Sequence, residues 1–108
     1  MSLYAECMAE RYGYEVIEDE NGFISFYFEN EVCKAFEIFV TKKRRGTEQW
    51  RFLWERLKAR CKDKGINKIV GFVDISKEEP EKRLIAYVRH GAKIKDLQEK
   101  IIIIEWSI

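Results

Sequence analysis

The 108-residue sequence lacks the features of several protein classes. It has one histidine and three cysteines without a CxxC pair, so neither a zinc or other metal site nor a disulfide framework is indicated. The net charge is only +1, which gives no overall field toward nucleic acid or membrane. The longest apolar run, residues 101–104, is far too short to cross a bilayer. These absences argue against secretion and membrane insertion, and a cytoplasmic location is expected.

The sequence also lacks linkers, repeats and low-complexity tracts. Its residues are 46% hydrophobic and 36% charged, a composition typical of folded globular proteins. A chain of this length has room for one hydrophobic core and no second one. The sequence therefore predicts a single continuous domain over residues 1–108.

The first half of the chain shows one helical pattern followed by strand patterns. The helix is expected to end at Gly13, and Asn21-Gly22 is a strong hairpin signal between the next two runs. The third run is apolar on both faces, which is typical of a central strand. The helix is expected at residues 2–12 and the strands at residues 14–18, 23–28 and 32–40.

The second half alternates helix and strand. Apolar residues recur at i, i+3, i+4 and i+7 in the first helix, which Gly65 ends. The strand that follows should be a parallel neighbour of the strand before this helix, because such crossovers are right-handed and join adjacent strands. The elements are expected at residues 47–64 (helix), 68–75 (strand), 80–90 (helix) and 101–106 (strand).

A basic turn follows the long strand. Four cations stand at residues 42–45, directly before Gly46 and the long helix. Backbone N–H groups at a helix N-terminus, together with nearby cations, form phosphate sites. The alternative is a solvated basic turn, since charged runs are common on protein surfaces.

These residues carry a resemblance to a known family. The order of elements from about Asp19 to Trp106 resembles the GNAT superfamily of N-acetyltransferases, whose members bind the pyrophosphate of acetyl-CoA with an R/Q-x-x-G-x-G/A motif after the fourth strand. Arg45 stands at the first position of that motif, and Tyr87 lies four residues before Gly91, as a tyrosine often does in the family. The resemblance implies an α/β (α+β) fold with a mixed, mostly antiparallel central sheet, a splayed parallel strand pair and flanking helices.

The resemblance also implies an activity and a set of site residues. The activity is acetyl transfer from acetyl-CoA, as co-substrate, to a primary amine on a small molecule or a protein. Tyr87 would protonate the departing thiolate, and Glu37 could relay a proton from the amine. Both also have a structural interpretation: Tyr87 as a core ring and Glu37 as an ordinary strand carboxylate. The implied cofactor-binding residues are Phe39, Val40, Arg44, Arg45, Gly46 and Thr47.

Two departures from the motif support a second hypothesis. Glu48 and Trp50 occupy its glycine positions, where glycine lets the backbone approach the pyrophosphate. The chain could therefore be a degenerate GNAT-like binding or assembly module. It also has one N-terminal helix where the family usually has two, so its acceptor cleft would be open or completed by a second subunit in a homodimer. A nucleic-acid-binding protein is the least favoured interpretation, because acidic residues interrupt the basic helix at residues 51–64.

Aromatic residues are abundant, and one set is interpreted as core. It comprises Phe23, Phe26, Phe28, Phe36, Phe39 and Phe72. Cys33 and Cys61 are likewise expected to be buried as small apolar residues.

Overall fold

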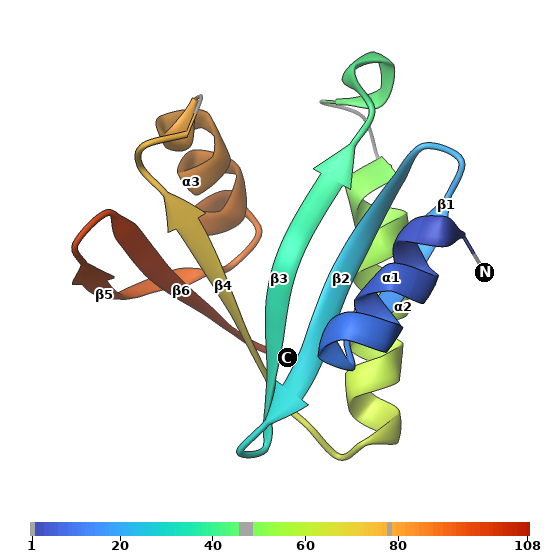
Figure 1. Ribbon diagram of the computed structural model, residues 1–108. Helices are drawn as coiled ribbons and strands as arrows, with labels where there is room; N and C mark the ends of the chain where they lie inside the picture. The colour runs from blue at the N-terminus through green and yellow to red at the C-terminus, as the bar shows by residue number, and fades with distance from the viewer. Residues whose placement is uncertain (1, 46–48, 78) are drawn as a thin grey trace.

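Six strands form one sheet, with helices on both of its faces (Figure 1). The computed structural model describes residues 2–45, 49–77 and 79–108. None of the helices in these ranges combines the length and the apolar character that a transmembrane helix needs. The elements are α1 (Leu3–Tyr12), β1 (Glu15–Asp19), β2 (Gly22–Glu29), β3 (Val32–Val40), the 3-10 turn η1 (Lys42–Arg44), α2 (Gln49–Asp63), β4 (Lys68–Asp74), α3 (Pro80–Arg89), β5 (Lys93–Gln98) and β6 (Ile101–Ser107).

The sheet is mixed, and one strand pair differs from all the others. The strand order is β1-β2-β3-β4-β6-β5, and every neighbouring pair is antiparallel except β3 and β4. These two are parallel and pair at only two positions, Cys33 with Ile69 and Lys34 with Val70. Beyond them the strands diverge toward their C-terminal ends (Figure 1). The predicted parallel neighbours and the splay between them are both confirmed.

A β-bulge accompanies this divergence. Ser25 on β2 pairs with Glu37, and the adjacent Phe26 pairs with Ala35, so Phe36 is an extra residue in β3. An extra residue bends its strand and increases the local twist. The bulge lies just past the last β3–β4 pair, and it therefore directs the end of β3 away from β4.

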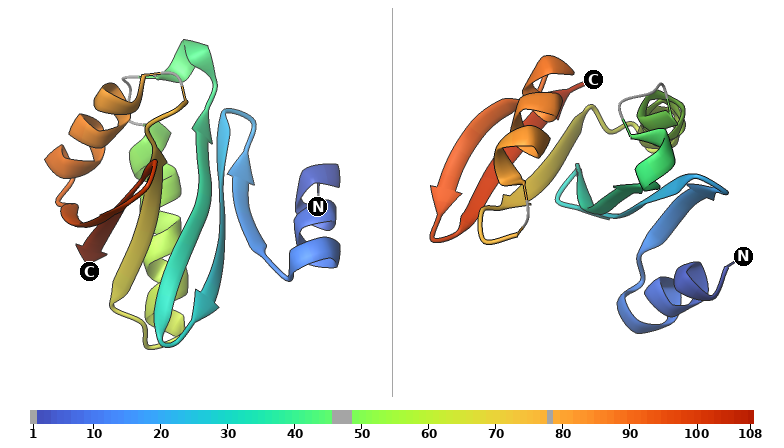
Figure 2. Two further views of the ribbon diagram at one scale, coloured as in Figure 1. Left: turned by 60° about the vertical axis from the view of Figure 1, so that its left-hand side comes forward. Right: turned by 90° about the horizontal axis from the view of Figure 1, so that it is seen from above.

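The helices form two layers around the sheet. Helix α1 lies against one face, and α2 and α3 lie against the other (Figure 2). The core between α2 and the sheet includes Phe26, Leu53, Leu57 and Ile69, all almost fully buried. Cys33 and Cys61 are buried there too, as expected. This packing fixes α2 behind the splayed strands, where its N-terminal turn lies near the end of β3.

The first helix has well-defined ends. The Ser2 side chain accepts a hydrogen bond from the Ala5 N–H and begins α1, while Gly13, with φ of 72°, ends it in the left-handed conformation that glycine favours. Ser2 Oγ also lies 2.8 Å from a carboxylate oxygen of Glu18, so this end of the helix is attached to β1. The predicted helix and its glycine stop are confirmed.

One strand was missed from the sequence. β5 is exposed at all six positions and pairs only with β6, at the edge of the sheet. Its bulge between Ile94 and Asp96 breaks the alternation of polar and apolar residues that identifies a half-buried strand. An edge strand of this kind forms because β6 offers it backbone hydrogen bonds, which leave no pattern in the sequence.

The assignment of six phenylalanines to the core was wrong for half of them. Phe36, Phe39 and Phe72 are 46%, 43% and 40% exposed, whereas Phe26 is buried. The error has a structural reason: among the described residues, α1 is the only helix on its side of the sheet, and its contacts are mainly with β1. The same face of β3 and β4 is left uncovered.

Gly22 holds β2 close to the end of β3, and this close approach can be tested. A Cβ at position 22 would overlap the Phe39 carbonyl oxygen, a backbone atom that can move only if β3 moves. We expect Gly22→Ala to lower the free energy of unfolding by about 1–3 kcal/mol, measured by urea denaturation. In Gly13→Asn, where an added Cβ meets nothing within 4 Å and asparagine tolerates positive φ, the change should stay within about 0.5 kcal/mol. Equal stability of Gly22→Ala and the unmodified protein would contradict the assigned contact.

Candidate active site

The chain turns sharply where β3 ends. The Thr41 N–H donates to the Asn21 carbonyl at 2.8 Å, which continues the contact with the β1–β2 turn, and the Arg44 N–H then closes η1 onto the Thr41 carbonyl at 2.9 Å. Lys42 and Lys43 are exposed on this turn. The predicted basic turn is therefore present at the open end of the splay.

Arg45 folds back onto β3. Its Nε donates to the Val40 carbonyl at 3.0 Å, and its guanidinium carbon lies 5.6 Å from the centre of the Phe39 ring. Three of the residues implied as cofactor-binding are thus brought together, but the Val40 carbonyl is already hydrogen-bonded within the chain. Gly46 and Thr47, two further residues of that set, lie outside the described residues, as does Glu48.

A carboxylate faces the basic turn from α3. The pKa of Glu79 is below its usual value, chiefly because Lys82 hydrogen-bonds to it at 3.0 Å and also because Arg45 and Lys42 are close. Glu79 directly precedes α3 and has a left-handed backbone, with φ of 52°. The start of α3 therefore lies near the basic turn and offsets part of its positive charge. The sequence analysis did not identify this residue.

A buried amide attaches the start of α2 to the hairpin of β1 and β2. Gln49 Nε2 donates to Asp19 Oδ2 at 2.6 Å, and Asp19 Oδ1 accepts from the N–H groups of Asn21 and Gly22. Partial burial opposes the charged form of Asp19, but these three hydrogen bonds outweigh it and lower its pKa. The hairpin and the first turn of α2 are consequently held in one position relative to each other.

Tyr87 lies on the inner side of α3, in a cluster of aromatic rings. Its ring meets Trp106 edge-on at 5.5 Å between centroids and lies 6.4 Å from Trp50. Burial raises the pKa of its hydroxyl, and the positive charge of Arg83 only partly opposes this. No described residue forms a hydrogen bond with the hydroxyl. Tyr87 is thus a core ring whose hydroxyl remains protonated at neutral pH.

Trp50 joins α2 to α3. Its ring stacks on His90 at 4.4 Å and on Trp54 at 5.0 Å. Because His90 follows the last residue of α3, the indole occupies space between the two helices. At the last position of the motif a glycine would leave that space empty, so Trp50 changes the shape of the region where the resemblance places the cofactor.

Glu37 lies on the opposite face of the sheet, under α1. Its Oε1 is 3.1 Å from the Tyr4 hydroxyl, and its N–H donates to Ser25 Oγ at 3.2 Å. The Tyr4 hydroxyl and Ser25 Oγ are also 3.2 Å apart. Burial, and to a smaller extent the nearby Glu37 charge, raise the pKa of Tyr4, so the phenol keeps its proton and donates a hydrogen bond to the carboxylate.

The two residues proposed as catalytic are therefore not in contact. Tyr87 packs on Trp50 of α2, whereas Glu37 bonds to Tyr4 of α1, and α1 and α2 lie on opposite faces of the sheet (Figure 2). They could act on one molecule only if it passed between β3 and β4 where these strands diverge. The supporting residues Tyr4 and Ser25 were not identified from the sequence, since nothing in the pattern of α1 indicates which strand residue Tyr4 meets.

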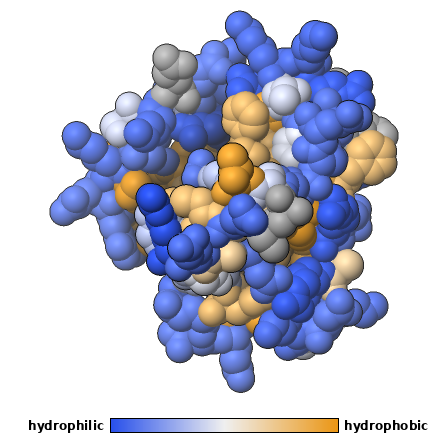
Figure 3. Space-filling model, turned by 45° about the vertical axis from the view of Figure 1, so that its right-hand side comes forward, coloured by the Kyte–Doolittle hydropathy of each residue, from blue (hydrophilic) through white to orange (hydrophobic). Residues whose placement is uncertain are grey.

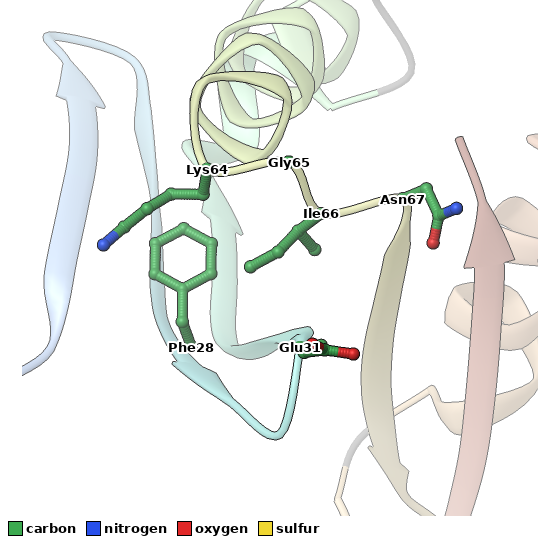
Figure 4. Close-up of a pocket in the computed structure, with 6 residues that line it drawn as sticks. All are labelled: Phe28, Glu31, Lys64, Gly65, Ile66 and Asn67. Atoms are coloured by element: carbon green, nitrogen blue, oxygen red, sulfur yellow. The ribbon is translucent and has the colours of Figure 1, made fainter.

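Two hollows in the described surface lie at the other end of the sheet. One, of about 470 Å³, is lined by Phe28, Glu31 and residues 64–67 (Figure 4). The second, of about 570 Å³, lies beside the end of α2 and includes Ile108. Neither is lined by a predicted site residue, so the candidate site is argued from the strand geometry and the chemistry of its residues.

Comparison with known proteins gives a clear result for the fold. No family model matches the sequence, and no curated protein is similar to it in sequence. Among solved structures, the PaiA N-acetyltransferase of Thermoplasma acidophilum in complex with coenzyme A matches with a TM-score of 0.73 and 17% identity, over 82% of this chain and 54% of that one. A GNAT family acetyltransferase of Elizabethkingia anophelis with acetyl-CoA bound matches with a TM-score of 0.72 and 15% identity, over 99% and 86%.

A third match is close to this chain in size. The anti-CRISPR protein AcrVA5 has a TM-score of 0.70 and 18% identity, over 87% of this chain and 98% of its own. By contrast, the chain spans only about half the length of the PaiA enzyme. The sheet order, the short parallel contact and these matches agree, and the chain therefore has the fold of the GNAT acetyltransferases.

Proposed function

We propose that the protein transfers an acetyl group from acetyl-CoA to a primary amine. The observation that carries this proposal is the two-residue parallel contact of β3 and β4, with the basic turn directly after β3. Two structures with the same fold contain coenzyme A or acetyl-CoA. The proposal assigns a corresponding cofactor site to the splayed end of the sheet.

The residues of β3 and the basic turn would bind the cofactor. Phe39 and Val40 would lie along the pantetheine, and Arg44, Arg45, Gly46 and Thr47 would bind the pyrophosphate. We expect Arg45 to leave the Val40 carbonyl, which accepts its Nε–H in the free protein, when a pantetheine amide takes its place. One movement of Arg45 would then bring a cation to the phosphates and free a backbone acceptor for a pantetheine amide.

The chemistry needs few groups from the protein. Bound acetyl-CoA supplies an activated thioester. Glu37 would accept a proton from the ammonium through water, since only the neutral amine is a nucleophile. A backbone N–H of β3 would stabilise the oxyanion. Tyr87, kept protonated by burial, would donate its proton to the departing thiolate.

A binding module without catalysis is the second candidate, and one observation favours it. Trp50 and His90 stack at 4.4 Å between α2 and α3, in the region that the cofactor would need. Glu79 also adds negative charge beside the basic turn. This packing would oppose the entry of acetyl-CoA.

Thermal unfolding separates the two candidates. At acetyl-CoA concentrations a hundredfold above the dissociation constant, binding adds about 2.7 kcal/mol to the free energy of unfolding, which for a domain of this size raises the Tm by roughly 10–20 °C. Arg45→Ala should reduce this shift, because a charge-assisted contact with phosphate is lost. Lys100→Ala, in the turn between β5 and β6, is the matched control and should keep the full shift. No shift at millimolar acetyl-CoA would favour the binding module.

The role of Tyr87 can be separated from its packing. Tyr87→Phe keeps the ring and removes a hydroxyl that no described residue bonds, so the Tm at neutral pH should change little. Activity with an amine acceptor should fall about 100-fold or more if the hydroxyl is the general acid. Release of the coenzyme A thiol measures this rate. An active Tyr87→Phe variant would remove Tyr87 from the mechanism.

The raised pKa of Tyr87 has a measurable consequence for stability. The hydroxyl loses its proton more readily in the unfolded chain, where its pKa is about 10, than in the folded protein. The contribution of Tyr87 to the free energy of unfolding is thus fully present below pH 10. It is lost as the pH rises toward the higher pKa that the hydroxyl has in the folded protein. We expect the unfolding free energy to decline less above pH 10 in Tyr87→Phe than in the unmodified protein, as measured by urea denaturation. Identical declines would show that this hydroxyl is not buried in solution.

A further inference from the structure

Aromatic side chains collect on the side of the sheet that faces α1. We call this surface the aromatic face; it comprises Tyr4, Tyr14, Phe23, Tyr27, Phe36 and Phe39. Phe23 packs on Tyr4 at 4.5 Å and on Phe39 at 5.6 Å, while Tyr14 packs on Tyr27 at 4.6 Å and on Phe36 at 5.3 Å. Viewed from the side of α1, hydrophobic side chains gather near the centre and hydrophilic ones surround them (Figure 3). Exposed apolar surface of this kind marks binding sites.

A fixed carboxylate lies within the aromatic face. Glu37 stands between Phe36 and Phe39 in sequence, pairs across the strands with the buried Ser25, and is held by the Tyr4 hydroxyl at 3.1 Å. It has no salt bridge to any described residue. A negative group bordered by aromatic rings attracts an organic ammonium ion, since both the charge and the ring faces favour a cation. The Arg45 guanidinium already lies 5.6 Å from the centre of the Phe39 ring, so an ammonium at Glu37 would share that ring with it or displace it.

The charge of the chain is divided between its two parts. Residues 1–40, which form α1 and β1–β3, contain nine acidic and two basic side chains, a net charge of −7, whereas residues 41–108 carry ten acidic and eighteen basic ones, a net charge of +8. Glu6 and Glu10 project from α1 as exposed residues, and neither forms an ion pair with a described residue. Glu15 and Glu29 in this segment are paired with Arg60 and Lys34, so the attraction of a molecule with several positive charges to the α1 side rests on carboxylates such as Glu6, Glu10 and Glu37.

The same face is open rather than enclosed. Phe36 and Phe39 remain about half exposed beside α1, and the two hollows described above lie elsewhere. A free small amine would reach Glu37 alone. An extended basic peptide that lies along α1 could place cations at Glu37, Glu6 and Glu10, and each ion pair would add to its affinity.

We propose that the acceptor is a lysine in a basic peptide segment, bound along α1 and the aromatic face with its ammonium at Glu37. The acetyl transfer rests on the proposed function, whereas the peptide binding does not. In the transfer, the lysine ammonium and the thioester become an amide, the coenzyme A thiol and one released proton. Glu6 and Glu10 bind the flanking cations and take no part in this chemistry.

Fluorescence anisotropy of labelled peptides, without acetyl-CoA, tests the binding. One peptide has a single lysine flanked by arginines, a second has the same lysine flanked by serines, and an unlabelled linear diamine is the competitor. We expect the arginine-flanked peptide to bind roughly tenfold more tightly, because several exposed ion pairs add together, and this advantage to be largely lost at ~0.5 M salt. The diamine should compete weakly.

Variants locate the site. Glu37→Gln and, separately, Phe39→Leu should each raise the Kd of both peptides about two- to fivefold. Glu6→Gln combined with Glu10→Gln should weaken only the arginine-flanked peptide. Glu99→Gln, which makes the same charge change in the distant turn between β5 and β6, should leave both Kd values unchanged.

The outcomes test the acceptor class, the location of the site and the acetyl transfer separately. Equal binding of the two peptides, or a diamine as tight as the arginine-flanked peptide, would overturn the peptide as acceptor. If neither Glu37→Gln nor Phe39→Leu changes the Kd of the peptides, the assigned site is wrong, even if acetyl-CoA raises the Tm. If the peptides bind as expected but acetyl-CoA gives no thermal shift, the peptide site is supported and the proposed acetyl transfer is contradicted.

Discussion

The structure depends on the short pairing between the parallel strands β3 and β4. Two parallel residue pairs join the halves of the sheet, and beyond them the strands separate. A bulge at Phe36 bends β3 at that point, while the core under α2 holds both strands on one helix. Because α2 spans the divergence, the sheet can open on one side without losing its shared core. The basic turn, the start of α2 and the start of α3 are all placed by this one feature.

Charge at the open end is already partly satisfied within the chain. Arg45 bonds the Val40 carbonyl, and Glu79 interacts with Lys82, Arg45 and Lys42. An anionic ligand would have to compete with these contacts. The Glu79–Lys82 pair is exposed, and such pairs are individually weak, whereas the Arg45–Val40 hydrogen bond is partly buried. Trp50 is different, because its stacking between α2 and α3 buries apolar surface. For the proposed function, the Trp50 packing is therefore a stronger obstacle to cofactor binding than the exposed charges.

Much of the fold could be predicted because its signals are local. Asn21-Gly22 identified the first hairpin, the spacing of Leu53, Trp54, Leu57 and Cys61 identified α2, and glycine stops were placed correctly at Gly13, Gly65 and Gly91. β5 was missed because an exposed edge strand needs no apolar pattern. The exposed phenylalanines were misassigned because composition cannot tell which face of a sheet a helix will cover. Their exposure depends on α1, a helix whose contacts are mainly with β1.

The sequence by itself determined the order of elements, the basic turn after Val40 and the helical stripe that packs α2 on the sheet. These follow from periodicity and from residues with special backbone preferences, both of which act over a few neighbouring positions. Only the tertiary structure decided that Arg45 returns to Val40, that Tyr4 holds Glu37, and that Glu37 and Tyr87 lie on opposite faces. Those contacts join residues that are distant in the chain or depend on the bulge in β3, and their geometry is set by packing rather than by local pattern.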